Sequence, residues 1–218
     1  GRWNDDVVDI WFKTKLKDGV ELGLGFTHDE QLVNLLTEYI SSYNDLPLYV
    51  YQIQTKFRNE LRAKSGIIRG REFLMKDLYS FNKTQEELNE FYEEVKKAYM
   101  KVYTRCGIGH RTYITFASGG TFSQYSHEFQ TLSEAGEDTI YVAENKGVAI
   151  NEEVLNEEVL KELSLEKKDL VFKKSVEVGN IFKQNTKYTD PFGLQYQDKG
   201  GQKKSIFMGG YGIGITRL

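Results

Sequence analysis

The sequence has one cysteine, Cys106, among its 218 residues. A single thiol excludes an internal disulfide framework, and it leaves no cysteine cluster for a structural zinc site. Nothing near Cys106 in the sequence would activate it as a nucleophile, so we expect an inert thiol. Such sparse cysteine usage is typical of a reducing compartment, and we expect a cytoplasmic protein.

Long hydrophobic runs and a strong net charge are also missing. No apolar stretch approaches the length that spans a bilayer, and no charged-then-apolar leader opens the sequence, so we expect no membrane partner. The formal net charge of −3 gives no bulk signal for nucleic acid, and any such contact would depend on a local basic patch. The first residue is Gly1 rather than methionine, which indicates a fragment.

The composition is that of an ordinary globular chain, with 39% hydrophobic and 28% charged residues. A chain of this length suffices for one large domain, or for a core with a small appendage, and can bury a sizeable apolar core. The function must therefore be inferred from local patterns.

The most informative stretch is LYVYQIQTKFRNELRAKSGIIRGREFLMKDLYSF, residues 48–81. Alternating polar and apolar runs on either side of Gly66 predict two strands joined by a loop. Successive strand residues face opposite ways, so one face of the second strand carries Arg69, Arg71, Phe73, Met75, Asp77 and Tyr79. A face that only met water would not need Phe73 and Met75 among its arginines, whereas a nucleotide-binding face would.

The chemistry of that face fits a nucleotide. Arg58 and Arg69 carry planar charged groups suited to phosphate oxygens, and Phe73 offers a ring on which a purine can stack. Glu60 can accept a hydrogen bond from an exocyclic amine. From composition alone, a hairpin with a solvated, charge-paired face is an equally good interpretation.

Order and spacing favour the nucleotide. FRNE at 57–60, a loop, and RGREF at 69–73 resemble the second signature motif of class II aminoacyl-tRNA synthetases. The longer string from residue 54 to residue 81 resembles the bacterial-type prolyl-tRNA synthetase family. MGGYGIGITRL at 208–218, a glycine-rich strand running into a helix near Arg217, is similar to the third class II motif. The resemblance covers nearly the whole chain.

The resemblance implies an α+β fold, the class II catalytic core, with a mainly antiparallel β-sheet flanked by helices. It implies activation of L-proline by ATP to prolyl-adenylate and transfer of the prolyl group to tRNA(Pro). The cofactors implied are ATP and Mg²⁺, and the partners are L-proline, tRNA(Pro) and a second copy in a full-length homodimer. The first class II motif would precede Gly1, and the anticodon-binding domain would follow Leu218.

The resemblance also assigns site residues. The two catalytic residues are Arg58 and Arg217. The residues implied to bind ATP are Arg58, Glu60, Arg69, Phe73, Glu177, Asn180, Gly212, Gly214 and Arg217. The residues implied to bind proline are Thr27, Asp29, Arg58, Met75 and Phe182. No metal-ligating residue is predicted, because Mg²⁺ is implied by ATP rather than by a visible set of ligands.

The sequence departs from the family pattern at several of these places. Asp29 stands where the family's Thr-x-Glu loop has glutamate, and its shorter side chain withdraws the carboxylate by one methylene. Asn180 stands where histidine is usual, and Gln184 follows where leucine is usual. Gly210 replaces a cysteine common in the bacterial enzymes, which we expect to widen the amino-acid pocket slightly.

Capping patterns predict two helices. Thr27 has Glu30 three residues on, and Thr84 has Glu87, which is the spacing of a capping box. The second helix should end near Gly107, because glycine suits a C-terminal cap. The bland interpretation of Thr27 is a helix cap only.

The histidines give no metal site. His127 and Glu128 are adjacent on a predicted strand, so they should face opposite ways and cannot ligate one ion together. His110 we interpret as a surface residue.

The chain divides into three segments: residues 1–145 and 175–218 as two parts of the catalytic core, and 146–174 between them. The middle segment repeats NEEVL at 151–155 and 156–160, which predicts a short acidic helical insertion. The resemblance would put a large editing domain here, and about thirty residues cannot form one. Editing of mischarged alanyl-tRNA should then be absent or supplied in trans, and the synthetic pocket alone discriminates by only about 1–3 kcal/mol.

Two alternatives stay open. Another class II synthetase, for threonine, serine, glycine or histidine, would share the fold and the ATP site, but the strings after Phe57 argue against it. A non-catalytic synthetase-like paralogue could bind an amino acid or a partner without forming an adenylate. The departures at Asp29, Asn180 and Gly210 favour the paralogue, and the intact arginines count against it.

Overall fold

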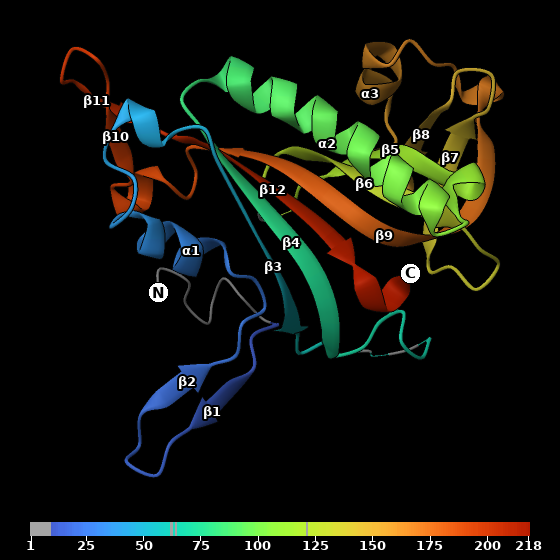
Figure 1. Ribbon diagram of the computed structural model, residues 1–218. Helices are drawn as coiled ribbons and strands as arrows, with labels where there is room; N and C mark the ends of the chain where they lie inside the picture. The colour runs from blue at the N-terminus through green and yellow to red at the C-terminus, as the bar shows by residue number, and fades with distance from the viewer. Residues whose placement is uncertain (1–9, 62, 64, 121) are drawn as a thin grey trace.

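The computed structural model describes residues 10–61, 63, 65–120 and 122–218. Its centre is an eight-stranded sheet in the order β3-β4-β12-β9-β6-β5-β8-β7 (Figure 1). The strands are β3 Leu48–Phe57, β4 Glu72–Asn82, β5 Thr112–Ser118, β6 Tyr125–Leu132, β7 Asp138–Ala143, β8 Val148–Asn151, β9 Val171–Asn185 and β12 Phe207–Gly214. Of the pairings between these strands, only β5 with β8 is parallel. The predicted α+β class with a mainly antiparallel sheet is confirmed.

The predicted hairpin is formed by β3 and β4, which pair from Leu48 opposite Phe81 to Phe57 opposite Glu72. The alternation of polar and apolar residues in the sequence corresponds to the two faces of β3. Lys56 points to one face and is buried, whereas Tyr51 and Ile53 point to the other and are 72% and 58% exposed. At Tyr51 and Ile53 the apolar side of β3 is therefore exposed to solvent, and at Lys56 its polar side faces the interior.

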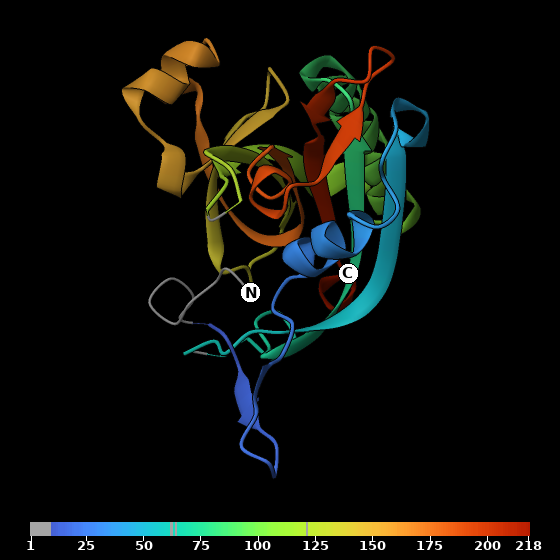
Figure 2. The same ribbon diagram turned by 90° about the vertical axis from the view of Figure 1, so that its left-hand side faces the viewer.

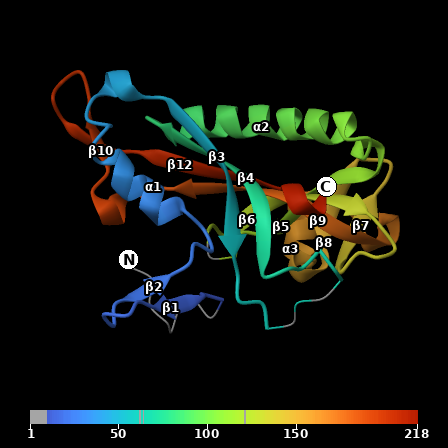
Figure 3. The same ribbon diagram turned by 60° about the horizontal axis from the view of Figure 1, so that its bottom comes forward.

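The longest helix, α2 (Gln85–Arg105), covers the sheet face opposite the polar side of β3 (Figure 3). It begins as predicted, because the Thr84 side chain accepts a hydrogen bond from the backbone N–H of Glu87, and it ends before Gly107, whose φ is +82°. Its buried side chains recur at helical spacing: Leu88, Tyr92, Val95, Tyr99 and Tyr103. The last four of these pack on Phe129, Val178, Ile181 and Tyr211 of the sheet.

The first helix, α1 (Asp29–Leu36), corrects one expectation. Its N-cap is His28, which makes no side-chain capping bond, and Thr27 stands outside the helix. The predicted capping box of Thr27 and Glu30 is therefore wrong, because the Thr27 hydroxyl donates to the Asp29 carboxylate instead.

Two small hairpins flank the sheet. β1 (Lys13–Lys15) and β2 (Glu21–Gly23) form one that projects from the body of the molecule (Figure 2). β10 (Gln195–Gln197) and β11 (Lys203–Ser205) form the other. Short 3-10 helices connect the elements: η1 Tyr43–Asp45, η2 Gly109–Arg111, η3 Glu152–Val154, η4 Lys167–Asp169, η5 Asp190–Phe192 and η6 Ile215–Arg217.

The acidic segment 146–174 contains the α-helix α3 (Glu157–Glu162), which lies between the 3-10 helices η3 and η4. Strand β8 and the first residues of β9 also fall within it, and both pair with other strands of the main sheet. Its apolar side chains form a small core of their own with Phe116 and Ile150: Val154, Val159, Leu160 and Leu165. Within the described residues, none of the helices combines the length and apolar character that a bilayer crossing requires.

The glycine-rich strand β12 lies between β4 and β9 and runs into η6, as predicted. Glycine is needed where β9 and β12 meet. A Cβ atom on Gly179 would come within 2.3 Å of the Tyr103 hydroxyl and 2.8 Å of the carbonyl oxygen of Gly212. The absence of side chains there lets the two backbones and α2 approach one another.

Candidate active site

A cavity of about 390 Å³ opens on the sheet face opposite α2. Its walls come from β3, β4, β6, β9 and β12, together with the segment before α1 and the β3–β4 loop. Every residue that the sequence predicted for the site lines it: Thr27, Asp29, Arg58, Glu60, Arg69, Phe73, Met75, Glu177, Asn180, Phe182, Gly212, Gly214 and Arg217. The fold thus brings together side chains from both ends of the chain.

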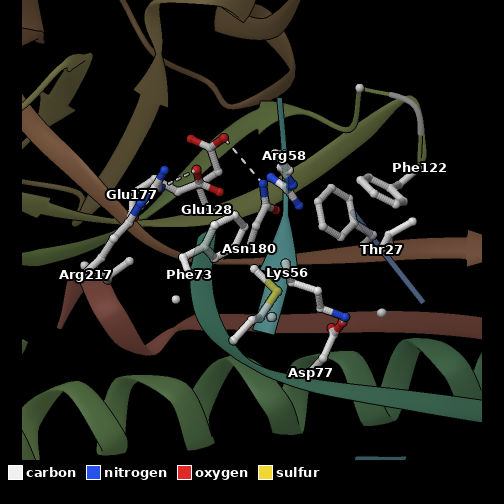
Figure 4. A pocket seen from close by; sticks show the side chains of 18 of the residues that line it. Thr27, Lys56, Arg58, Phe73, Asp77, Phe122, Glu128, Glu177, Asn180 and Arg217 are labelled. Atoms are coloured by element: carbon white, nitrogen blue, oxygen red, sulfur yellow. Dashed lines mark hydrogen bonds and ion pairs between the residues drawn. The ribbon is translucent and has the colours of Figure 1, made fainter. Parts of the chain in front are cut away.

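One end of the cavity is rich in arginine–carboxylate pairs (Figure 4). Arg217 Nη1 donates to the carbonyl oxygen of Glu177 at 2.8 Å and to its Oε2 at 3.1 Å. Arg69 Nε donates to Glu137 Oε2 at 2.7 Å, and its Nη1 lies 3.7 Å from Glu60 Oε2. Both guanidinium groups are thereby held in place, and a phosphate could replace the carboxylates as their partner.

Arg58 lies between the two ends of the cavity. Its guanidinium carbon is 5.2 Å from the ring centroid of Phe73, and its Nε donates to the carbonyl oxygen of Phe26 at 3.4 Å. Burial lowers the pKa of Arg58, while the charge of Glu177 acts in the opposite direction. A buried cation in a cavity is favoured by an incoming anion.

Glu128 is a cavity residue that the sequence did not assign to the site. Its Oε2 accepts hydrogen bonds from Gln130 Nε2 at 2.8 Å and Asn151 Nδ2 at 2.9 Å, and its Oε1 accepts one from Asn180 Nδ2 at 3.4 Å. Burial, and then the charge of Glu177, raise the pKa of Glu128. In the sequence, only the alternation of side-chain directions along strand β6 indicated which way the Glu128 side chain points.

That alternation is confirmed on the other face of β6. His127 lies against α2, where its Nδ1 is 2.8 Å from the Tyr92 hydroxyl, and burial lowers its pKa to about 4. His110 is exposed, as predicted. Over the described ranges there is no group of three or more histidine, cysteine, aspartate or glutamate side chains that could hold a metal ion.

The floor at the other end holds a buried ion pair that the sequence did not reveal. Lys56 Nζ lies 2.7 Å from Asp77 Oδ2, and the Tyr79 hydroxyl donates to the same oxygen at 2.6 Å. His28 Nδ1 is 2.6 Å from Lys56 Nζ. Their mutual contact joins β3, β4 and the segment before α1, so no single run of the sequence predicts it.

Above this floor lie the residues predicted to bind proline. The Thr27 hydroxyl donates to one oxygen of Asp29, and Gln184 Nε2 donates to the other at 2.6 Å. Burial is the main cause that raises the pKa of Asp29. The rings of Phe182 and Phe122 stand 4.8 Å apart and add an apolar wall. The sequence missed Gln184 and Phe122 as site residues.

The expectation that Gly210 widens this end of the cavity stays a prediction. The side chain of Gln184 lies in the space beside Gly210, and a Cβ atom there would lie 3.1 Å from Gln184 Nε2.

Residues 12–218 match the family model of the tRNA synthetase class II core domain (G, H, P, S and T). The chain belongs to this family. The match spans the cavity residues from Thr27 to Arg217, and the class II core agrees with the antiparallel sheet described above.

Curated members of the family are similar over most of the chain, which confirms the resemblance to prolyl-tRNA synthetases. A proline–tRNA ligase of Sulfurimonas denitrificans is 38% identical over 216 residues, which cover 91% of this chain and 49% of the relative. One from Bacillus cereus (strain G9842) is 45% identical over 154 residues, 71% of this chain and 27% of the relative. The chain thus spans about half the length of the first relative.

Solved structures share the fold. Giardia lamblia prolyl-tRNA synthetase in complex with prolyl-adenylate has a TM-score of 0.73 at 15% identity, covering 98% of this chain and 37% of the other. Prolyl-tRNA synthetase from Cryptosporidium parvum, complexed with L-proline and AMP, has a TM-score of 0.69 at 15% identity, covering 95% and 36%. At this identity the likeness concerns the fold alone.

Proposed function

We propose that this chain is the catalytic core of a proline–tRNA ligase. The protein would use ATP to convert L-proline to prolyl-adenylate and would then transfer the prolyl group to tRNA(Pro). One observation carries the proposal: a single cavity is lined by Arg69 of the β3–β4 loop and Arg217 of η6 at one end, by the buried carboxylate of Asp29 at the other, and by Arg58, directly after β3, between them. The 38% and 45% identities to proline–tRNA ligases support the choice of amino acid.

In the first step an oxygen of the proline carboxylate attacks the α-phosphorus of ATP. A new P–O bond forms to proline, the bond to the β-phosphate oxygen breaks, and pyrophosphate leaves. No side-chain nucleophile is needed, so the protein acts by positioning and by stabilising charge. Arg58, between the two ends of the cavity, holds the proline carboxylate and the α-phosphate and is the principal catalytic residue.

The outer phosphates and the base bind at the arginine-rich end. Arg69 and Arg217 exchange their carboxylate partners for phosphate oxygens, because bidentate guanidinium groups suit them. Phe73 and Glu60 receive the adenine ring and its amine. The remaining ATP contacts come from Glu177 and Asn180 and from the side-chain-free backbone at Gly212 and Gly214.

Mg²⁺ fits the donor set of this end. The carboxylates of Glu128 and Glu177 both line the cavity, and Mg²⁺ is commonly held by one or two carboxylates together with substrate phosphates. When bound, the ion supplies charge neutralisation for the phosphate oxygens. Glu128 is already oriented by its three amide donors, and because its pKa is raised it would release a proton when it binds the ion.

Proline binds at the opposite end. Thr27 and Asp29 receive its protonated imino group, and Met75 and Phe182 line its ring. Because Asp29 is only 2% exposed, the amine meets a carboxylate with little competing water.

Discrimination against alanine rests on this pocket. The segment between β8 and β9 holds only η3, α3 and η4, so we propose that editing is absent from this chain. Loss of the ring methylenes costs alanine about 1–3 kcal/mol of contact, equivalent to roughly a tenfold to two-hundredfold preference for proline.

For the full-length protein we propose a cytoplasmic homodimer. The lone, exposed Cys106 agrees with a reducing compartment. Analytical ultracentrifugation of the full-length protein tests the dimer, and cell fractionation tests the compartment.

Amino-acid-dependent ATP–pyrophosphate exchange tests the function. The full-length protein should exchange with proline, and the ratio of alanine to proline exchange measures the selectivity of the pocket. Cysteine and threonine complete the comparison. Exchange with threonine alone would assign another class II activity. A folded protein that binds ATP but exchanges with none of them would overturn the proposal in favour of a non-catalytic paralogue.

A further inference from the structure

Gln184 is a buried amide in the wall of the cavity, 3% exposed. Its Nε2 donates to Asp29 Oδ1 at 2.6 Å, which fixes the orientation of the amide. Its Oε1 is buried and has no hydrogen-bond partner within the part of the chain that the structure describes. Because buried polar atoms are nearly always hydrogen-bonded, an open acceptor in a cavity wall indicates a donor supplied by a ligand.

The backbone directs Gln184 to this place. Lys183 pairs with Gly209 and Asn185 with Met208, so Gln184 is an extra residue in β9 opposite β12. Such a bulge re-aims side chains. Lys183 Nζ lies 4.8 Å from the ring centroid of Tyr92 on the α2 side, and Gln184 takes the cavity side.

Gly210 provides the space for this amide. A Cβ atom at Gly210 would lie 3.1, 3.2 and 3.3 Å from Nε2, Oε1 and Cδ of Gln184, closer than ordinary side-chain contacts. The short side chain of Asp29 leaves the gap that Gln184 bridges. Three positions that depart separately from the family pattern are therefore one packed arrangement of Asp29, Gln184 and Gly210.

We propose that Gln184 is a specificity-determining residue for the substrate amine, an inference that rests on the proposed function. A protonated secondary amine has two N–H donors. Asp29, oriented by the Thr27 hydroxyl, accepts one, and Gln184 Oε1 accepts the other while its Nε2 holds the Asp29 carboxylate. Gly210 acts only by leaving room for Gln184. Burial, which raises the pKa of Asp29, makes the carboxylate a stronger partner for an incoming cation once it is ionised.

The test is a double-mutant cycle in the full-length protein, read by pyrophosphate exchange. Gln184→Leu removes both the oxygen that would accept the substrate N–H and the amide nitrogen that holds Asp29. Gly210→Ala displaces the side-chain amide of Gln184. Each should raise the KM for proline about tenfold to a hundredfold, the range of a hydrogen bond to a charged group, and leave the KM for ATP unchanged. The double variant should be no worse than Gln184→Leu alone, because Gly210 acts through Gln184. Gly200→Ala, in an exposed turn, is the matched glycine control.

A second measurement separates an amine contact from general damage to the pocket. Tetrahydrofuran-2-carboxylate has a ring oxygen and no N–H, and serves as a competitive inhibitor. Gln184→Leu should weaken proline binding and leave the inhibition constant of this analogue within about twofold of the wild-type value. An equal loss for both ligands would overturn the amine contact.

The remaining outcomes are distinct. No exchange by the wild-type protein with any amino acid would overturn the proposed function and this inference together. Wild-type exchange with an unchanged proline KM in Gln184→Leu would overturn the inference alone. Multiplying effects in the double variant would show that Gly210 acts independently of Gln184.

Discussion

Lys56 of β3 and Asp77 of β4 form an ion pair of 2.7 Å beneath the cavity, and they are only 1% and 8% exposed. Desolvation makes such a pair costly to break from one side, because the remaining charge stays buried without its partner. The hydroxyl of Tyr79 donates a hydrogen bond to the Asp77 carboxylate that also pairs with Lys56. The ion pair is therefore part of a network that supports the amino-acid end of the cavity.

Lys56→Met should therefore lower the free energy of unfolding by about 3–5 kcal/mol. The double variant Lys56→Met/Asp77→Leu should recover a large part of that loss, since no unpaired charge is left. Urea denaturation followed by circular dichroism measures both. Equal stability of the single variant and the wild type would contradict the buried pairing.

Arg58→Ala should reduce proline-dependent pyrophosphate exchange at least a hundredfold, because it removes the group proposed to stabilise charge at the α-phosphate. The fold should stay intact, with an unchanged circular dichroism spectrum. Arg71→Ala is a control, since Arg71 is exposed, does not line the cavity and should retain activity within a few fold. Wild-type turnover by Arg58→Ala would refute the assignment.

Glu128 should make stability depend on pH. Its pKa is raised from 4.5 to about 8, so the folded chain binds more protons than the unfolded chain between these values. The free energy of unfolding contributed by this group therefore falls as the pH rises through that window, by at most about 1.4 kcal/mol per pH unit. Subtracting the pH profile of Glu128→Gln isolates this slope. A difference that is flat from pH 5 to 8 would count against the raised pKa.

Gly179→Ala should destabilise the fold by about 1–3 kcal/mol, because the new methyl group would overlap the Tyr103 hydroxyl and the backbone of Gly212. Gly212→Ala is the matched comparison. Its Cβ would meet the Met75 sulfur at 3.3 Å, the end of a flexible side chain that can move, so it should cost less. The denaturation midpoint of Gly179→Ala should be lower than that of Gly212→Ala. The opposite order would contradict the packing argument.

Removal of divalent metal by EDTA should abolish pyrophosphate exchange and leave the melting temperature of the ligand-free protein unchanged. The reason is that no metal-ligating cluster exists among the residues from 10 onward that the structure describes. Under the proposed function Mg²⁺ acts together with ATP, and we expect it to have no role in folding. A fall in the melting temperature after EDTA treatment would indicate a structural metal.

Local patterns predicted a large part of this molecule. The alternation of polar and apolar residues predicted the two faces of β3 and β4. A capping residue and an apolar stripe predicted α2. The resemblance to the family motifs identified thirteen cavity residues. These signals all act over a few neighbouring positions. The roles given to those residues stay predictions until ligands are measured.

Contacts between residues far apart in the sequence could not be predicted from such local patterns. Gln184 and Asp29 are 155 positions apart, and neither signals the other in the sequence. The predicted capping box failed for a local reason, because the Thr27 hydroxyl donates to Asp29, two residues further along the chain. The packing of Gln184 beside Gly210 is a tertiary contact, which no local rule reveals.

The order of the sheet has a consequence for folding. β12 is the last strand in the sequence described here, yet it lies in the middle of the sheet, between β4 and β9. Until it is synthesised, the hairpin β3–β4 and the strands from β5 to β9 have no common partner and expose the edges that it will join. Pairings over such sequence distances are slow to form. We therefore expect the cavity to be complete only once β12 has paired with both neighbours, and the proposed nucleotide binding to report that step.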